Sequence, residues 1–353
     1  MGSQRAWRQA AIGGGIVCTV LAAAAFAESG YRILKRFPVP SGEETWDYIA
    51  IDEAGRRLFL AHDTQVEVLS AETGELLGTI ADTKGAHATV LVPEFNRGFV
   101  TNGDNATVTM FDFRSLKKLS DIRTGELPDG MVYEPSTKRV FSMNTVGRNS
   151  TAIDAADGTV VGTVDLDGKP EQATADGAGH VFVDLKDKAV VARIDARKLV
   201  VDQRWPIAGC DRPTSSAMDK KARRLFIGCR NLMLYVMDSD TGRVITHLPI
   251  GDNVDNTVFD PDTGLIFTST EDAKITVMHE DGPDAYRVVE TVKTEAGSKT
   301  MALDPKTHRL FVPYGEVEKV AATSGSSAGG KVDLSGMRKR VLPNTFGVLV
   351  VGR

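Results

Sequence analysis

The sequence predicts an all-β fold, because one short motif recurs along almost the whole chain of 353 residues. In each copy a phenylalanine stands inside an apolar run, as in "RRLFLAH" around Phe59 and "RGFVTN" around Phe99. The remaining copies centre on Phe141, Phe182, Phe226, Phe267 and Phe311, so that successive phenylalanines are 40, 42, 41, 44, 41 and 44 residues apart. Seven copies at this period indicate a repeat architecture.

Each copy has the turn residues that separate four short strands. Residues 46–80 contain the predicted strands "YIAI", "RLFLA", "QVEVLS" and "LLGTI", with turns at "DEAG" and "ETGE". Similar turns recur as "DAADG" (154–158), "DSDTG" (238–242), "DPDTG" (260–264) and "DPKTH" (304–308). Asp, Gly and Pro accept tight turn geometry at low cost. Four-stranded units of this length predict the blades of a seven-bladed β-propeller.

The two ends of the repeat region complement each other. The last copy supplies "KTMAL", "RLFVP" and, after an interruption, "FGVLVVG", but it has no fourth strand. An unassigned strand, "YRILKRFPV" (31–39), precedes the first copy. A stacked β-solenoid is the structural alternative. Pairing the N-terminal strand into the last blade closes a ring and removes exposed sheet edges, which favours the propeller. We therefore expect a single propeller domain over residues 28–353.

The interruption in the last blade, residues 315–344, is rich in Gly, Ser and Ala. Such a composition buries little apolar surface, so we expect a flexible surface loop inserted in the last blade.

Residues 1–27 differ from the rest of the chain. Arg5 and Arg8 precede an uncharged apolar stretch that ends in Ala25-Phe26-Ala27, the pattern of a cleavable secretory signal peptide. A retained membrane anchor is the alternative, and we expect export to a bacterial periplasm, with no membrane span in the mature chain. Removing this segment takes away two positive charges and moves the formal net charge from −5 to −7. An acidic protein is a poor general binder of nucleic acid.

The mature chain keeps two cysteines, Cys210 and Cys229. In an oxidising compartment such a pair is expected to form a disulfide, and the repeat alignment places both at the same face of blade five. A metal-thiolate site is the alternative.

The repeats resemble the YVTN-repeat β-propeller family, whose second strand ends in Tyr-Val-Thr-Asn. "FVTN" at 99–102 is the nearest match, and "FSMN" at 141–144 is a looser one. The resemblance covers about residues 31–353 and implies an exported bacterial propeller. It implies no particular activity, because propellers host enzymes, binding modules and scaffolds alike.

Aligning the copies places one set of residues at the start of the innermost strands, about twelve positions before each phenylalanine. This first set is Asp47, His87, Asp129, Glu171, Thr214, Asp255 and Lys299. A second set, three positions after each phenylalanine, is His62, Asn102, Asn144, Leu185, Cys229, Thr270 and Tyr314, with Asp184 as the polar neighbour in blade four. Both sets are expected at one mouth of the central channel. The predicted ligand-binding residues are Asp47, His62, His87, Asn102, Asp129, Asn144, Glu171, Asp255, Lys299 and Tyr314.

Clustered carboxylates and histidines are able to bind a divalent cation, or to share a proton as general acid and base. The predicted metal ligands are Asp129, Glu171 and His87. Oxygen ligands favour Ca²⁺ or Mg²⁺, whereas histidine nitrogen shifts the preference toward Zn²⁺. The alternative interpretation is a solvated funnel whose polar residues only face water.

Three functions remain open at this level. The first is a periplasmic binding or scaffold protein that holds a small ligand or a protein partner at the channel mouth, and we expect a monomer. The second is a metal-dependent hydrolase of the lactonase type, which the first set resembles in residue type only. The third is single-stranded nucleic-acid binding, known among exported relatives of the family. The net charge and the scarcity of alternating aromatic and basic residues count against it.

Overall fold

The computed structural model describes residues 1–2, 30–40, 44–321 and 337–353. This part of the chain forms seven four-stranded sheets and one separate two-stranded sheet. Its only helical segments are two 3-10 turns, η1 (Pro93–Phe95) and η2 (Gly103–Asn105). The predicted seven-bladed β-propeller is therefore confirmed.

Blades one to three follow the chain in order, each strand pairing antiparallel with the next. Blade one contains β2 (Trp46–Asp52), β3 (Arg57–His62), β4 (Gln65–Ser70) and β5 (Leu76–Ile80). Blade two contains β6 (Ala86–Val92), β7 (Arg97–Asn102), β8 (Thr107–Asp112) and β9 (Lys118–Arg123). Blade three contains β10 (Pro128–Glu134), β11 (Arg139–Asn144), β12 (Asn149–Asp154) and β13 (Val160–Asp165).

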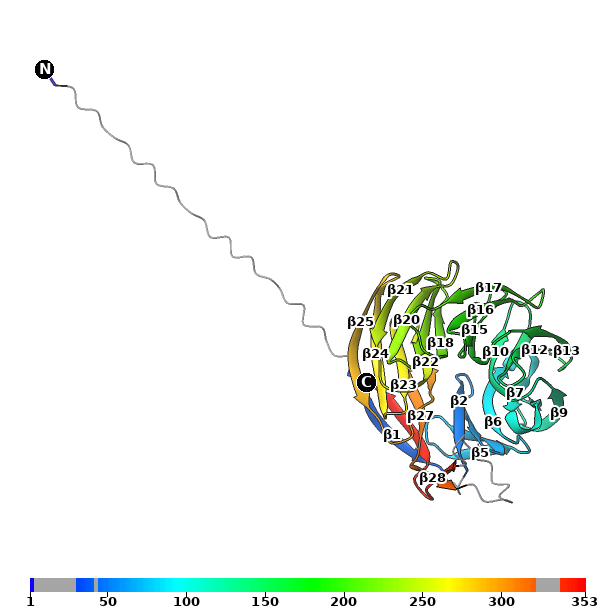
Figure 1. The fold of residues 1–353 in the computed structure, drawn as a ribbon. Coiled ribbons are helices and arrows are strands. Elements are labelled where there is room, and N and C mark those ends of the chain that lie inside the picture. The colour runs from blue at the N-terminus through cyan, green and yellow to red at the C-terminus, as the bar shows by residue number, and fades with distance from the viewer. Residues whose placement is uncertain (3–29, 41–43, 322–336) are drawn as a thin grey trace.

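Blades four to six repeat this order. Blade four contains β14 (Pro170–Ala175), β15 (His180–Leu185), β16 (Val190–Asp195) and β17 (Val200–Pro206). Blade five contains β18 (Pro213–Asp219), β19 (Arg224–Cys229), β20 (Met233–Asp238) and β21 (Val244–Pro249). Blade six contains β22 (Val254–Asp260), β23 (Leu265–Thr270), β24 (Lys274–Gly282) and β25 (Ala285–Lys293). In Figure 1 the first strands, such as β2, β6 and β10, surround the centre, and the fourth strands, such as β9 and β13, lie at the rim.

Blade seven joins the two ends of the chain. Its strands are β26 (Ala302–Asp304), β27 (Arg309–Tyr314), β30 (Gly347–Gly352) and the N-terminal β1 (Arg32–Pro38). β1 pairs antiparallel with β30 from Arg32 opposite Gly352 to Pro38 opposite Gly347. The predicted closure by the N-terminal strand is therefore present, and it supplies the outermost strand of this blade.

The repeat phenylalanines fill the spaces between blades. All seven are at most 1% exposed. Phe311 of blade seven, for example, belongs to one apolar cluster with Leu58 and Leu60 of blade one. Burial of such a side chain contributes roughly 1.5–3 kcal/mol. The motif recurs because every blade must present the same apolar wedge to its neighbour.

A left-handed residue starts the second strand of every blade, three positions before the repeat phenylalanine. These residues, with their φ angles, are Arg56 (53°), Asn96 (55°), Lys138 (57°), Gly179 (112°), Arg223 (60°), Gly264 (67°) and His308 (55°). Some of them also bind the preceding blade. Arg56 Nη1 lies 2.7 Å from the buried Asp304 Oδ2, and His308 Nδ1 lies 2.8 Å from the buried Asp260 Oδ2. The turns therefore connect blades at the face opposite the predicted site.

The insertion in blade seven has regular structure at both ends. β28 (Val317–Ala321) pairs antiparallel with β29 (Met337–Val341). The expectation of a loop throughout residues 315–344 is thus wrong at these ends. Both ends contain β-branched valines, which favour strands, and averaging composition over the whole segment concealed them. Residues 322–336 lie outside the described part.

The predicted signal peptide, residues 1–27, falls almost wholly within residues 3–29, which the structure does not describe. In the described part, no helix has the length and apolar character required to cross a membrane.

The predicted disulfide between Cys210 and Cys229 is present, with an S–S distance of 2.03 Å. It joins the segment before β18 to the end of β19, so the two sulfurs are not available as metal ligands. A closed loop of 19 residues corresponds to about 3 kcal/mol of stabilisation in the chain-entropy model.

Replacing Phe37 by Ala tests whether closure through β1 stabilises the fold. Phe37 is 5% exposed and packs in the cluster between blades seven and one. Phe37→Ala should lower the free energy of unfolding by about 3–5 kcal/mol, measured by urea denaturation. Lys35→Ala, on an exposed position of the same strand, is the control and should change it by less than about 0.5 kcal/mol. Equal effects of the two substitutions would show that β1 is not needed for closure.

Candidate functional site

The first set of predicted residues occupies irregular positions of the innermost strands. In six blades the pairing between first and second strands shifts register at this point. The shifts lie at Trp46/Ile49, Ala86/Thr89, Pro128/Met131, Pro170/Ala173, Pro213/Ser215 and Val254/Asn256. The unpaired residues include Asp47, His87, Asp129, Glu171, Thr214 and Asp255. A β-bulge redirects the side chain that it carries, so these residues leave the regular alternation of their strands.

These residues, together with Lys299 of blade seven, form what we call the mouth ring. His87 Nδ1 lies 2.5 Å from Asp47 Oδ2 and 3.7 Å from Asp129 Oδ1. Lys299 Nζ lies 3.5 Å from Asp47 Oδ1 and 3.5 Å from Asp255 Oδ2. Residues from five different blades are therefore linked around one opening.

Hydroxyl groups of adjacent blades hold the backbone of the mouth ring. Thr101 Oγ1 donates to the carbonyl of Asp129 at 2.7 Å, and Ser269 Oγ donates to that of Lys299 at 2.7 Å. Thr300 Oγ1 donates to the carbonyl of Asp47 at 2.8 Å, across the junction of blades seven and one. Because these bonds run between blades, the ring positions depend on the closed propeller.

Further charged side chains surround the mouth ring. Arg230 Nη2 lies 3.7 Å from Asp255 Oδ1, and Lys186 forms an ion pair with Glu171. Glu271 adds a negative charge that acts on Lys299 and Asp255. The four ring carboxylates and Glu271 face three cations, Lys299, Arg230 and Lys186. Negative groups outnumber positive ones.

The pKa values of the ring residues reflect burial and this excess of negative charge. Burial, and then the nearby Asp129, raise the pKa of Glu171 to about 7, against the opposing effect of Lys186. Burial also raises the pKa of Asp255, although Lys299 opposes it. For Lys299, burial lowers the pKa, but Asp47 and Asp255 raise it by more, so its ammonium stays charged. Glu171 therefore exchanges its proton near neutral pH.

The predicted metal ligands are only partly brought together. The donor atoms of Asp47, His87 and Asp129 all lie within 4.8 Å of one another. Glu171 was predicted in place of Asp47, but it is paired with Lys186. Asp47 takes its place because blade one stands directly beside blade two, which carries His87.

Two members of the second set, Asn102 and Asn144, lie inside their blades rather than in the mouth ring. The Asn102 amide donates to Thr107 Oγ1 at 3.0 Å and to Thr109 Oγ1 at 2.8 Å. Asn144 likewise donates to Thr151 Oγ1 at 3.0 Å. Both asparagines are at most 1% exposed. They fix the end of the second strand to the third, so the expected position at the mouth is corrected.

His62 and Tyr314 also lie away from the mouth ring. The His62 ring is 4.7 Å from that of Phe346, between blades one and seven, and it is buried. Burial raises the pKa of the Tyr314 hydroxyl, near Arg36 of the outermost strand β1. The same position after the phenylalanine therefore has different neighbours in different blades, which the sequence alignment did not resolve.

Tyr48 and Asp184 belong to the site but were not selected as ligand-binding residues. Burial raises the pKa of Tyr48 well above its ordinary value, and Asp129, Asp255 and Asp47 add to this effect, so the phenol stays neutral. Tyr48 begins the predicted strand "YIAI" and was not assigned a role there. Asp184 is 1% exposed, and in the described part its Oδ2 has no hydrogen-bond partner. Burial, with Glu171 nearby, raises its pKa to about 7.

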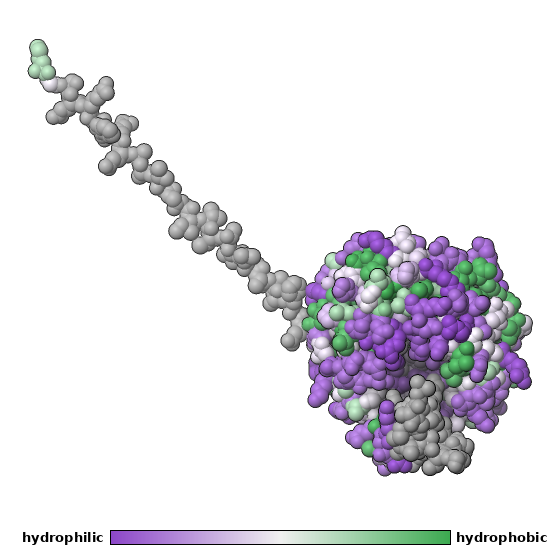
Figure 2. Space-filling model, viewed as in Figure 1, coloured by the Kyte–Doolittle hydropathy of each residue, from purple (hydrophilic) through white to green (hydrophobic). Residues whose placement is uncertain are grey.

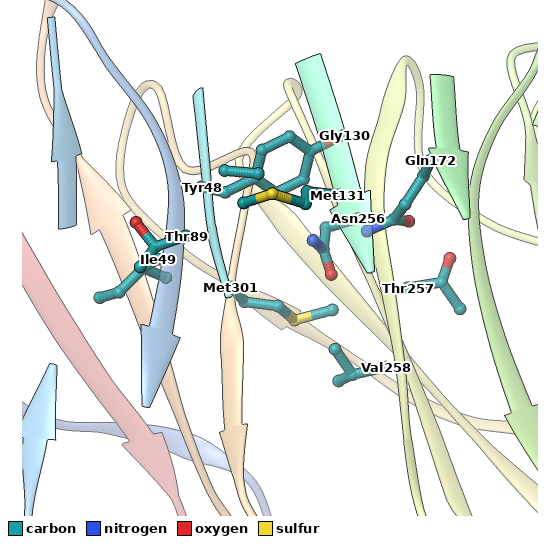
Figure 3. Close-up of a pocket in the computed structure, with 11 residues that line it drawn as sticks. Tyr48, Ile49, Thr89, Gly130, Met131, Gln172, Asn256, Thr257, Val258 and Met301 are labelled. Atoms are coloured by element: carbon teal, nitrogen blue, oxygen red, sulfur yellow. The ribbon is translucent and has the colours of Figure 1, made fainter. Parts of the chain in front are cut away.

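A cavity of about 220 Å³ lies in the channel next to the mouth ring. Its lining combines polar and apolar side chains on the innermost strands, among them Tyr48, Thr89, Met131, Gln172, Asn256 and Met301. In Figure 3 the Tyr48 ring extends toward the strand that carries Gly130, and the amides of Gln172 and Asn256 lie on the other side of the cavity. The arrangement joins a charged rim to a partly apolar chamber.

The buried Asp184 should make stability depend on pH. Because its folded-state pKa is raised, the folded protein binds a proton more tightly than the unfolded chain. The free energy of unfolding should therefore fall as pH rises from about 4 to about 7. Asp184→Asn should remove this contribution and exceed the parent at pH 8 by on the order of 2–4 kcal/mol in urea denaturation. The exposed Asp262→Asn is the control, and a pH-independent difference between Asp184→Asn and the parent would contradict the prediction.

Comparisons with known proteins identify the fold and nothing finer. No protein-family model matches the sequence, and no curated protein matches it. Among solved structures, 1814 chains match. One is a chain of the hydrazine synthase of Kuenenia stuttgartiensis, with 15% identity and a TM-score of 0.69 over 78% of this chain and 94% of that chain. At this identity the likeness shows a shared fold alone, so the function has to be argued from the site.

Proposed function

We propose that the protein is an exported binding protein of the YVTN-repeat type that holds a small, positively charged ligand at the mouth ring. The observation that carries the proposal is the convergence of Asp47, Asp129, Glu171 and Asp255 on one opening, with negative groups in excess. Burial is the main cause of the raised pKa of Glu171, and a bound cation offsets the repulsion from Asp129 that adds to it.

The charge distribution within the ring favours one side for the ligand. Lys299 already neutralises Asp47 and Asp255 in part, at 3.5 Å from each. The carboxylate of Asp129 faces His87 at 3.7 Å, and Glu171 lies next along the ring. A ligand cation is therefore best placed beside Asp129, between blades one and four.

The surface supports a small ligand over a large apolar partner. On the face that Figure 2 shows, hydrophilic residues dominate, and the hydrophobic residues form small separate groups. Interaction sites for large partners usually expose a contiguous apolar patch. The acidic ring also repels the phosphates of a nucleic acid.

Export to the periplasm is supported by two features. The first 27 residues have the composition of a secretory signal, and the disulfide between Cys210 and Cys229 requires an oxidising compartment in most organisms.

A metal-dependent hydrolase is the second candidate, and the grouping of Asp47, His87 and Asp129 within 4.8 Å favours it. Two carboxylates and an imidazole suit Zn²⁺ or another transition metal better than Ca²⁺, which prefers oxygen ligands alone. Asp47, His87 and Asp129 would hold such an ion, which would supply an activated water as nucleophile. Glu171, whose pKa is raised to about 7, would serve as a proton acceptor next to this group.

Cation binding at the ring is tested with Zn²⁺ and Ca²⁺ by isothermal titration calorimetry on chelator-treated protein. Asp129→Asn should weaken binding at least about tenfold, because the ring loses a direct ligand. Asp262→Asn removes the same charge from a turn at the opposite end of β22 and should leave binding unchanged. Absence of binding by either ion would set aside the metal candidate, and equal losses in the two variants would place the cation elsewhere.

Catalysis is tested separately with a panel of lactones. If the second candidate holds, Glu171→Gln should abolish turnover while the protein keeps its metal content, because the base is lost and the three ligands remain. Metal content is measured by elemental analysis of the same samples. Turnover that survives in Glu171→Gln, or no turnover in the metal-loaded parent, would leave binding as the function.

A further inference from the structure

The cavity beside the mouth ring, which we call the chamber, has polar and apolar walls that a bare metal ion would not contact. We propose that it holds the body of a small organic ammonium ion, whose charged end lies in the mouth ring and whose other end carries a hydrogen-bond donor. This inference rests on the proposed function, since the ring must attract the cation first.

Unpartnered acceptors inside the chamber provide the first argument. Asn256 is 4% exposed, and in the described part of the chain no group donates to its Oδ1. Thr89 is 8% exposed, and in the same part of the chain its Oγ1 also has no hydrogen-bond partner. A buried polar atom left without a hydrogen bond is costly, and native proteins rarely keep one without a reason. Both residues line the cavity, and a ligand N–H or O–H satisfies them.

Apolar and aromatic groups provide the second argument. Tyr48 directly follows the ring residue Asp47, and Met131 and Met301 place thioethers in the same cavity (Figure 3). The neutral phenol ring of Tyr48 attracts a cation through its face, and thioethers adapt to small aliphatic groups. Acidic ring, aromatic face and apolar wall occur together in sites for organic ammonium ions rather than for anions or neutral sugars.

One position of the chamber wall requires glycine, and the chamber itself is small. Gly130 lines the cavity, and a Cβ atom added there would lie 2.3 Å from the carbonyl oxygen of Glu171. Any larger residue therefore displaces the backbone of the ring. The volume of about 220 Å³ is below the 300–1,000 Å³ typical of drug-sized sites, which limits the ligand to a few carbon atoms.

Three amines separate the contributions of charge, body and donor. Methylammonium carries the charge alone, butylammonium adds an aliphatic body, and 4-amino-1-butanol adds a terminal hydroxyl. Dissociation constants are measured by ligand-observed NMR titration of the purified protein. Butylammonium should bind at least about tenfold tighter than methylammonium, because each buried CH₂ strengthens binding several-fold. 4-Amino-1-butanol should bind a further threefold to tenfold tighter through a hydrogen bond to Asn256.

Two variants assign these gains to the chamber and to the ring. Asn256→Leu keeps the number and branching of the side-chain heavy atoms and should remove the gain from the hydroxyl while keeping that from the body. Asn256→Ala serves the same purpose if the leucine variant does not fold. Asp129→Asn should weaken all three amines together, because it acts on the charge.

The outcomes distinguish the two proposals. If methylammonium and butylammonium bind with equal affinity and Asp129→Asn weakens both, the proposal of a ligand in the chamber is overturned. The proposal of a cation in the mouth ring is then kept. Zn²⁺ binding without amine binding likewise overturns the proposal for the chamber and leaves the proposal for the ring. Binding by none of these cations overturns both proposals, and binding of 1-butanol as tight as that of butylammonium removes the role of charge.

Discussion

The antiparallel pairing of β1 with β30 is the constraint on which the rest of this structure depends. It joins residues more than three hundred positions apart and turns six complete blades and one incomplete blade into a ring. Only a closed ring fixes the distance between innermost strands of blades one and seven, where Thr300 bonds the backbone of Asp47. Lys299 then stands 3.5 Å from Asp47. An open array would leave this ion pair without a fixed geometry. The electrostatics of the mouth are therefore a property of closure.

Bulges convert a regular fold into a site. In an unbroken ladder, alternate side chains of an innermost strand point into the spaces between blades, where the fold needs apolar groups. In six blades the register shifts leave one or two residues unpaired at the start of the innermost strand, and most of these positions carry charged groups. Burial and the nearby Asp129 both raise the pKa of Glu171, so the gathering of carboxylates adds to the cost of burying them. Lys299, Arg230 and Lys186 offset it in part.

The repeat period and the turn residues predicted the fold down to the closing strand, because every blade must meet the same packing requirement at its phenylalanine. The same alignment found the mouth ring, since each innermost strand starts at the channel. It failed for Asn102, Asn144, His62 and Tyr314, because strand alternation sends a side chain into a blade or between blades, and sequence spacing does not fix that direction. Tyr48 was hidden in an apolar run, and its position follows from the bulge between Trp46 and Ile49, for which turn residues give no signal. Asp184 was noted as a polar neighbour in blade four but was not selected as a site residue.

The charge distribution of the site comes from positions at which the seven repeats differ in sequence. The phenylalanine is the same in all seven blades, whereas the ring position varies among Asp, His, Glu, Thr and Lys. This variation makes the ring electrically uneven: His87 and three carboxylates occupy blades one to four, while blades five to seven contribute Thr214, Asp255 and Lys299. The chamber lining is uneven as well, with the bulky Tyr48 from blade one and both Gly130 and Met131 from blade three. Charge is therefore offset to one side of a pseudo-symmetric channel. A purely structural ring has no need of that offset, and a ligand with one charged end does.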